Sequence, residues 1–124
     1  MRIYFAGDHA GFEMKQKLIE FARSLGHEIA DLGPTEPKTG DDYPDYAKLV
    51  AEKVAQDAEH NHGILLCGSG VGMEVTANKF AGIRAGNIQS IEVAKCARND
   101  DDINILALGS DFISLEDAQA ITAT

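Results

Sequence analysis

The sequence predicts an α/β fold in which a five-stranded parallel sheet carries helices on both faces, the doubly wound arrangement. Five short β-like runs alternate strictly with helical stretches, at residues 3–6, 28–32, 63–67, 83–85 and 103–108. Such alternation favours parallel strands joined by right-handed crossovers, because each strand must return through a helix before the next can pair. With 124 residues, 44% of them hydrophobic, the chain is long enough for one domain whose core needs neither disulfides nor metal.

The first two helices follow from apolar residues at helical spacing. Gly26 is expected to end the first helix, and Pro44 suits the first turn of the second because its fixed φ matches a helix. The apolar face predicted for the first helix consists of Met14, Leu18, Phe21 and Leu25. The buried stripe predicted for the second consists of Tyr46, Ala47, Val50, Ala51 and Val54.

Three further helices complete the alternation. The third opens near Met73, and the fourth covers residues 90–98. Ser114, followed three residues later by Asp117, resembles a capping box with Asp in the usual place of Glu, and so predicts a short last helix. Residues 33–43 contain several prolines and glycines and are predicted to form one long surface loop.

The charge balance excludes two classes of partner. The chain has 20 Asp and Glu against 11 Lys and Arg, a net charge of −9. Binding to nucleic acid or to an anionic membrane surface relies on clustered Lys and Arg, so neither partner is expected.

The same sequence predicts a cytoplasmic protein. No apolar run approaches the roughly 18 residues of a membrane span, and the opening residues become polar too soon for a signal peptide. The two cysteines, Cys67 and Cys96, are too sparse for a secreted disulfide scaffold and are expected to stay reduced.

Ligands of parallel α/β sheets bind at the carboxyl ends of the strands, and three loops are assigned to that edge: residues 7–11, 67–72 and 99–102. In the second loop a buried strand runs into three alternate glycines and then a helix, which leaves several backbone N–H groups to face an anion. The glycines fit neither a dinucleotide fingerprint nor a P-loop. A phosphatase-like cysteine loop would need Arg six positions after Cys67, where the chain has Met73. The loop is therefore interpreted as a site for a phosphate or an oxyanion.

Several side chains near these loops have two interpretations each. Cys67 is either a working thiol, activated by the neighbouring N–H dipoles, or a small buried hydrophobe at a strand end. Asp8 and His9 are either an acid–base pair at the same edge, or a helix cap beside an exposed imidazole. Tyr43 is a candidate to line the pocket, and Asp42 before it is interpreted as a helix cap.

Two polar clusters and the second cysteine complete the candidates. His60 and His62 lack metal-ligand spacing and lie before the third strand, at the amino end of the sheet, so no metal site is predicted. The run from Asp100 to Asp102 is either a solvated turn or part of the site. Cys96 is interpreted as a packing residue on the fourth helix.

Five segments in unbroken order resemble the family of ribose-5-phosphate isomerase B and the related galactose-6-phosphate isomerase subunits. They are GDHAGF (7–12), DYP (42–44), CGSGVG (67–72), ANKFAGIRA (77–85) and NILALG (104–109). The resemblance implies a Rossmann-like domain and a homodimer, with a dimer of dimers left open, whose active sites lie at the subunit interface. It also implies aldose–ketose isomerisation of a sugar or sugar phosphate through a cis-enediolate, in carbohydrate metabolism, without metal or organic cofactor. The default reaction converts ribose 5-phosphate to ribulose 5-phosphate in the pentose phosphate pathway.

The resemblance also implies a role for each matching residue. Cys67 matches the base that carries a proton between C1 and C2, and Ser69 supplies a hydroxyl to the moving oxygen. Asp8 and Tyr43 match residues near the sugar hydroxyls, and His9 matches a phosphate contact. The amides of Gly68, Gly70, Val71 and Gly72 would stabilise the enediolate oxygen, and Asn78 and Asp101 are added to the substrate-binding residues.

The chain departs from this family at three places. Asp100 stands where the family has the ring-opening histidine of the facing subunit, so Asp100 is assigned that catalytic position. Asp111 stands where the family has a phosphate-binding arginine, and the single domain, residues 1–124, lacks the family's usual long carboxyl-terminal helix. These changes weaken phosphate binding by several kcal/mol if nothing compensates. The alternatives are therefore an isomerase for another or an unphosphorylated sugar, and a catalytically idle sugar-binding homologue.

Overall fold

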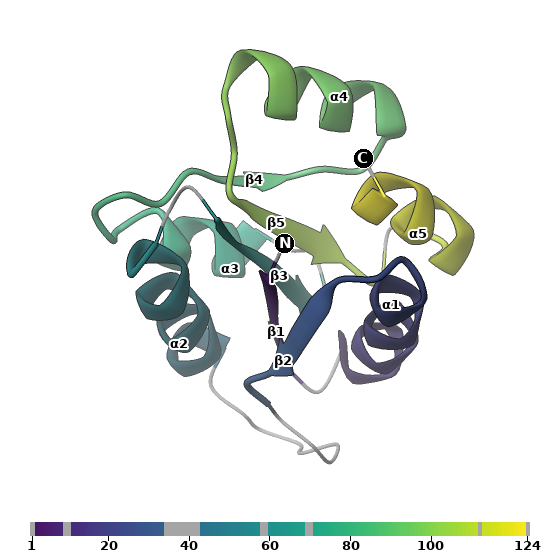
Figure 1. Ribbon diagram of the computed structural model, residues 1–124, viewed down its shortest axis with the longest axis horizontal. Helices are drawn as coiled ribbons and strands as arrows, with labels where there is room; N and C mark the ends of the chain where they lie inside the picture. The colour runs from purple at the N-terminus through teal and green to yellow at the C-terminus, as the bar shows by residue number, and fades with distance from the viewer. Residues whose placement is uncertain are drawn as a thin grey trace.

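Five parallel strands form a single sheet in the computed structural model, which describes residues 2–8, 11–33, 43–57, 60–68, 71–111 and 113–123 (Figure 1). The strands are β1 (Arg2–Gly7), β2 (Glu28–Asp31), β3 (Asn61–Cys67), β4 (Ala85–Asn87) and β5 (Ile105–Gly109), and their order across the sheet is β2-β1-β3-β5-β4. Each neighbouring pair is parallel. The predicted doubly wound, Rossmann-like α/β fold is confirmed.

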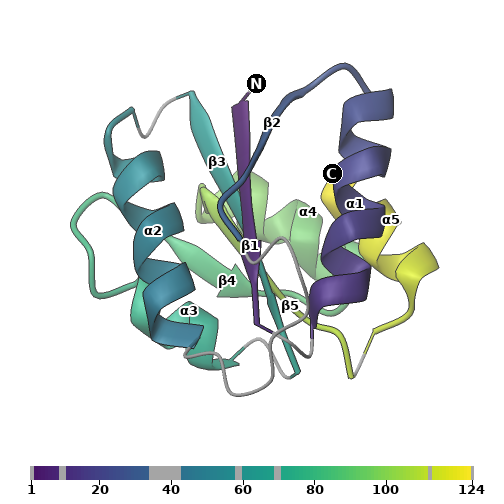
Figure 2. The same ribbon diagram turned by 90° about the horizontal axis from the view of Figure 1, so that it is seen from below.

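Helices cover both faces of the sheet (Figure 2). One face carries α1 (Phe12–Ser24), α4 (Ile91–Asp100) and α5 (Leu115–Ala123), and the other carries α2 (Tyr43–Ala55) and α3 (Val71–Ala77). Along β3, Ile64 and Leu66 pack towards the first set of helices, whereas Leu65 and Cys67 pack towards the second. Because both faces are covered, the central strands are apolar on both sides.

The buried face of α1 differs from the predicted one. The buried residues are Lys15, Leu18, Ile19 and Ala22. Leu25, predicted to be on the apolar face, is 48% exposed, because the helix ends at Ser24 and Gly26 turns the chain away with a φ of +90°. The prediction that Gly26 ends the helix is confirmed.

The other helices follow their sequence signals closely. In α2 the four small or branched members of the predicted stripe are fully buried, and Tyr46 is half-buried. Ser90 caps α4 by accepting the N–H of Val93 at 3.2 Å, and Ser114 caps α5 by accepting the N–H of Asp117 at 3.1 Å. The helix α3 begins two residues before the predicted Met73, and α4 runs two residues beyond the predicted end.

The strands β4 and β5 each begin two residues later than predicted, for an identifiable reason. The N–H of Arg84 donates to Oδ1 of Asn104 at 2.9 Å, and the N–H of Ile103 donates to the carbonyl of Ala97 at 3.2 Å. These bonds tie the segments before the strands to a side chain and to α4, so strand pairing starts only at Ala85 and Ile105.

Two remaining sequence expectations concern loops and membranes. Most of the predicted loop at 33–43, including Asp42, lies outside the described residues. Of the helices described, none has both the length and the apolar character needed to cross a membrane.

Candidate active site

The carboxyl ends of β1, β3 and β5 bring Asp8, Cys67 and Ser110 to one edge of the sheet. Cys67 pairs with Gly109 across β3 and β5, and Asp8 follows the last residue of β1. The N–H of Asp8 donates to the carbonyl of Leu66 at 3.0 Å, and the N–H and hydroxyl of Ser110 donate to the carbonyl of Cys67 at 2.8 and 3.2 Å. The strand order reverses between β1 and β3, which is where ligands of such sheets bind. The prediction that Asp8 and Cys67 share this edge is confirmed.

Cys67 is the last residue of β3, with 6% of its surface exposed. It belongs to the apolar cluster on the α2 and α3 side, together with Tyr4, Ala6 and Met73. Both interpretations of this cysteine therefore hold structurally: it is a member of the core, and it ends a strand at the point where a ligand of the sheet would lie.

Asp8 fixes the turn that leads into α1. Its Oδ1 accepts the N–H of Gly11 at 3.1 Å. A Cβ on Gly11 would lie 2.7 Å from Cβ of Leu66 and 2.8 Å from the Leu66 carbonyl oxygen, so the turn packs directly on the end of β3. Only glycine permits this approach, and the approach holds the Asp8 loop against the strand that carries Cys67.

A buried ion pair between Lys15 and Asp31, which was not predicted from the sequence, supports the loop that carries Asp8. Nζ of the fully buried Lys15 lies 2.9 and 2.8 Å from the two carboxylate oxygens of Asp31, at the end of β2. Oδ1 of Asp31 accepts the N–H of Gly33 at 3.0 Å, and the carbonyl of Gly33 accepts the N–H of Gly7 at 3.1 Å. The chain of contacts ends one residue before Asp8. A lysine within the buried stripe of α1, followed by a carboxylate at the end of the next strand, is the sequence signal for this pair.

Asp111 stands beside the Cys67 loop, as the resemblance implied. Its N–H donates to the carbonyl of Gly68 at 3.0 Å. A hollow of about 220 Å³ between α1 and the turn after β5 is lined by Glu13, Lys17 and Asp111, with Ser110 among its other residues. One cation and two carboxylates thus surround this hollow.

The acidic run 100–102 does not lie at the carboxyl edge, so the prediction that it shares this edge within one chain is wrong. Asp100 ends α4, and α4 returns the chain to the amino end of β5. There the carbonyl of Asp101 accepts Nε of Arg84 at 2.6 Å, and Asp102 lies 3.6 Å from the guanidinium of Arg98. A helix that follows a parallel strand returns the chain to the amino edge, so residues at its end lie opposite the carboxyl edge. The prediction for residues 100–102 did not take this direction into account.

Asn78 also lies away from Cys67. Its Nδ2 donates to the carbonyl of Ala85 at 3.0 Å, and its Oδ1 accepts the Ala85 N–H at 2.8 Å. Ala85 is the first residue of β4, so this side chain fixes the α3–β4 connection at the amino edge. Within the chain the Asn78 amide thus has a structural role, and its contact with the substrate stays a prediction.

The remaining predicted site residues are only partly described. His9, Ser69 and Gly70 lie outside the described residues, as does the side chain of Tyr43, the first residue of α2. Gly68 is half-buried at the mouth of the loop. Val71 and Gly72 are the first two residues of α3 and follow the Cys67 loop directly.

The two histidines for which no metal site was predicted, His60 and His62, lie at the amino edge of the sheet. Nδ1 of the exposed His60 lies 3.1 Å from a carboxylate oxygen of Asp57, and His62 is half-buried in β3. Across the described ranges, no three His, Cys, Asp or Glu side chains converge as metal ligands would. Cys96, interpreted as a packing residue, is exposed on α4, so that interpretation is wrong.

Comparison with known proteins gives consistent relatives. A family model described as ribose/galactose isomerase matches residues 3–124. Ribose-5-phosphate isomerase B of Escherichia coli is 42% identical over 120 residues, which cover 97% of this chain and 79% of that protein. The probable ribose-5-phosphate isomerase B of Mycoplasma pneumoniae is 44% identical over 115 residues, covering 93% of this chain and 75% of that protein.

Solved structures agree with the sequence relatives. The crystal structure of ribose-5-phosphate isomerase B from Mycoplasma genitalium with bound ribulose-5-phosphate superposes with a TM-score of 0.96 at 38% identity, covering 98% of this chain and 80% of that chain. The enzyme from Clostridium thermocellum superposes with a TM-score of 0.94 at 36% identity, covering 99% of this chain and 82% of that chain.

Proposed function

Because the chain belongs to the ribose/galactose isomerase family and is an aldose–ketose isomerase, we propose that it interconverts ribose 5-phosphate and ribulose 5-phosphate with Cys67 as the base. The observation that carries the proposal is the position of Cys67, which ends β3 at the strand-order reversal, beside Asp8 and Ser110. The same placement argues against a catalytically idle homologue.

The chemistry requires one base that reaches two adjacent carbons from the same face. The Cys67 thiolate removes the C2 proton of the open-chain aldose, which leaves a cis-enediolate. Return of that proton to C1, with transfer of the hydroxyl proton between O1 and O2, yields the ketose, so no atoms are gained or lost. Backbone N–H groups of residues 68–72 stabilise the negative oxygen, and the Ser69 hydroxyl assists its proton transfer. No metal or organic cofactor takes part.

The surrounding residues bind the sugar. Asp8 and Tyr43 hold its hydroxyl groups, and His9 contacts the phosphate. The bond from the Gly11 N–H to Asp8 supports this role, because it fixes the carboxylate beside the strand that carries Cys67. A thiol base must stay reduced, so we place the enzyme in the cytoplasm.

We further propose a homodimer in which Asp100 and Asp101 complete the partner's site. Within one chain these residues lie at the edge opposite Cys67, so they serve a sugar at Cys67 only from another subunit. The same helix, α4, exposes apolar surface at Ile91 (36%) and Val93 (52%), which suits burial against a second copy.

Subunit mixing tests this arrangement. Cys67→Ser and Asp100→Ala homodimers are each expected to be impaired, whereas a refolded mixture should regain activity, because one site of each heterodimer then has both native residues. A mixture with no more activity than its components, although heterodimers form, would show that Asp100 does not act across the interface.

A second candidate substrate is a sugar without phosphate. Glu13 and Asp111 outnumber Lys17 around the hollow beside the Cys67 loop. Two unit charges 4 Å apart near a protein surface interact by about 4 kcal/mol, so one misplaced carboxylate matters to a phosphate dianion.

The direct test is to incubate the enzyme with ribose 5-phosphate and with ribose, and to follow ketose formation by NMR. We expect ribulose 5-phosphate from the first. Turnover of ribose alone would establish the second candidate, and turnover of neither sugar would contradict the proposed reaction.

A further inference from the structure

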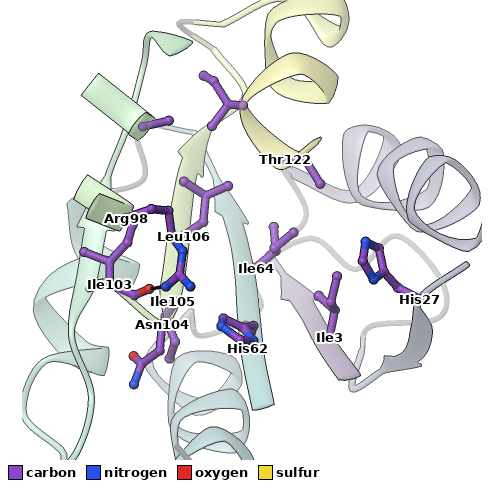
Figure 3. A pocket seen from close by; sticks show the side chains of 13 residues that line it. Ile3, His27, His62, Ile64, Arg98, Ile103, Asn104, Ile105, Leu106 and Thr122 are labelled. Carbon is purple, nitrogen blue, oxygen red and sulfur yellow. Dashed lines mark hydrogen bonds between the residues drawn. The ribbon is translucent and has the colours of Figure 1, made fainter. Parts of the chain in front are cut away.

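A cavity of about 160 Å³ lies at the amino edge of the sheet, on the face covered by α1, α4 and α5 (Figure 3). Its wall on the sheet side is formed by Ile3, Ile64 and Leu106, one from each of three adjacent strands. Ile121 of α5 and Ala94 of α4 also line it, so most of the lining is aliphatic. Nothing in the proposed reaction uses this cavity.

Two polar atoms in the wall have no hydrogen-bond partner among the residues that the structure describes. They are Nδ1 of His62 and Oγ1 of Thr122, both buried from solvent. Both residues line the cavity, His62 from the start of β3 and Thr122 from the end of α5 (Figure 3). A buried polar group without a partner is costly, so these two atoms favour an occupant that can donate or accept a hydrogen bond.

The charges around the cavity favour a neutral occupant. Burial lowers the pKa of His62 and the nearby positive charge of Arg98 lowers it further, which outweighs the raising effects of a hydrogen bond to the His60 backbone and of the Asp102 carboxylate. The imidazole is therefore neutral near pH 7, and its Nδ1 can act as an acceptor. The Arg98 guanidinium donates to the carbonyl of Ile103 and lies 3.6 Å from the carboxylate of Asp102. That cation is therefore already partnered.

The volume sets the size of the occupant. A dry aliphatic cavity of about 150 Å³ in an engineered protein accepts a single benzene ring. A single water, in contrast, needs two to four polar partners, and the lining here is mainly hydrocarbon. One six-membered ring with one hydroxyl group matches the volume, and its hydroxyl group can pair with one of the two polar atoms.

We propose that this cavity is a binding site for a small neutral hydroxylated aromatic molecule of the size of phenol. Its ring packs on Ile3, Ile64 and Leu106, and its hydroxyl group donates a hydrogen bond to His62 Nδ1. The site is separate from the active site: His62 and Cys67 stand five residues apart on one strand, about 16 Å. The proposal does not depend on the identity of the sugar.

Phenol is the probe, and isoleucine-methyl NMR of the wild-type protein is the measurement. We expect saturable shifts at the methyl groups of Ile3, Ile64 and Ile121, and none at Ile83 on the opposite face of the sheet. The ¹⁵N signal of His62 Nδ1 should move towards that of a hydrogen-bonded acceptor. Benzene should bind about two- to tenfold more weakly than phenol, as expected for one lost hydrogen bond, and benzoate more weakly than phenol because it carries a charge.

A matched pair of variants separates the polar and apolar contributions. His62→Phe keeps a ring of similar size without the acceptor nitrogen and should weaken phenol binding severalfold while leaving benzene binding nearly unchanged. Thr76→Val, on α3 and outside the cavity, is the control and should change neither. No saturable shift in the wild-type protein would overturn the proposal, as would a resident water that phenol fails to displace. Equal binding of phenol and benzene would overturn the assignment of a hydroxylated ligand.

Discussion

The two edges of the sheet are made by the same strands but are held together in different ways. At the carboxyl edge, the loops that carry Asp8 and Ser110 are joined to β3 mainly by main-chain bonds, from Asp8 to Leu66 and from Ser110 to Cys67. At the amino edge, buried side-chain amides add to the main-chain bonds: Asn61 donates to the carbonyl of Lys53 at 3.0 Å, and Asn104 joins two further segments. A site that must present reactive side chains benefits from loops held by their backbone. The amino edge uses its polar side chains for structure.

The largest effect is expected at Cys67. Cys67→Ser keeps nearly the same volume but supplies a much poorer base near neutral pH, so kcat should fall by roughly 10²- to 10⁴-fold while the fold stays intact. The control is Ser24→Ala at the exposed end of α1, which should retain full activity. Steady-state kinetics of both variants measure kcat, and circular dichroism checks that each variant is folded. A wild-type rate for Cys67→Ser would place the base elsewhere, with Asp8 the next residue to test.

Loss of the buried ion pair should be the next largest effect. Lys15→Met leaves the carboxylate of Asp31, whose side chain is only 21% exposed, without its cation, and should cost about 3 kcal/mol of unfolding free energy in urea. Asp31→Leu added to Lys15→Met should recover much of that loss, because no unpaired charge then remains. If the single variant were as stable as the wild type, the pair would not be what supports the loop before Asp8.

An amide at the amino edge should affect stability without affecting chemistry. Oδ1 of Asn104 accepts the Arg84 N–H, and its Nδ2 donates to the carbonyl of Gly82, each at 2.9 Å. Asn104→Leu should therefore lower the unfolding free energy by about 1–3 kcal/mol and leave kcat nearly unchanged. A fall in kcat at constant stability would contradict the division of labour between the two edges.

These contrasts also show what the sequence could and could not predict. Alternation of β-like runs and helices, together with Ser90, Ser114 and Gly26 as helix boundaries, was sufficient for the fold, because these signals act locally. The predicted position of the acidic run 100–102 was wrong, because the edge at which these residues lie depends on the direction of the crossover helix before them. Lys15 was missed because an amphipathic pattern treats a lysine as exposed, and only the tertiary fold supplies its partner Asp31.

Asp111 offers a smaller effect at the carboxyl edge. Asp111→Arg replaces a repulsive charge with an attractive one and should lower the KM for ribose 5-phosphate severalfold, with little change for ribose. The improvement should shrink as salt is added, since the residue is exposed and its charge is screened. Glu20→Arg, which makes the same change of charge at an exposed position on α1, serves as the control. An unchanged KM would mean that another cation, with His9 the nearest candidate, already binds the phosphate.

The smallest effect is expected from His62. Its pKa is lowered in the folded protein by burial and by Arg98, so the unfolded chain takes up a proton more readily. The unfolding free energy should therefore decline slightly as the pH falls below about 6.5, the ordinary value for histidine. His62→Gln should remove this component, whereas His60→Gln should not. Urea titrations of the two variants between pH 7.5 and pH 5, all at about 25 °C, provide the comparison; identical pH profiles for wild type and His62→Gln would contradict it.

The central claim is that one thiol at the carboxyl end of β3 moves the sugar proton. The most direct measurement is exchange of the C2 proton of ribose 5-phosphate with deuterium from D₂O, followed by NMR for the wild type and for Cys67→Ser. The account predicts enzyme-dependent deuterium incorporation at C2 that is lost in the folded Ser variant. Exchange at an undiminished rate in Cys67→Ser would contradict it.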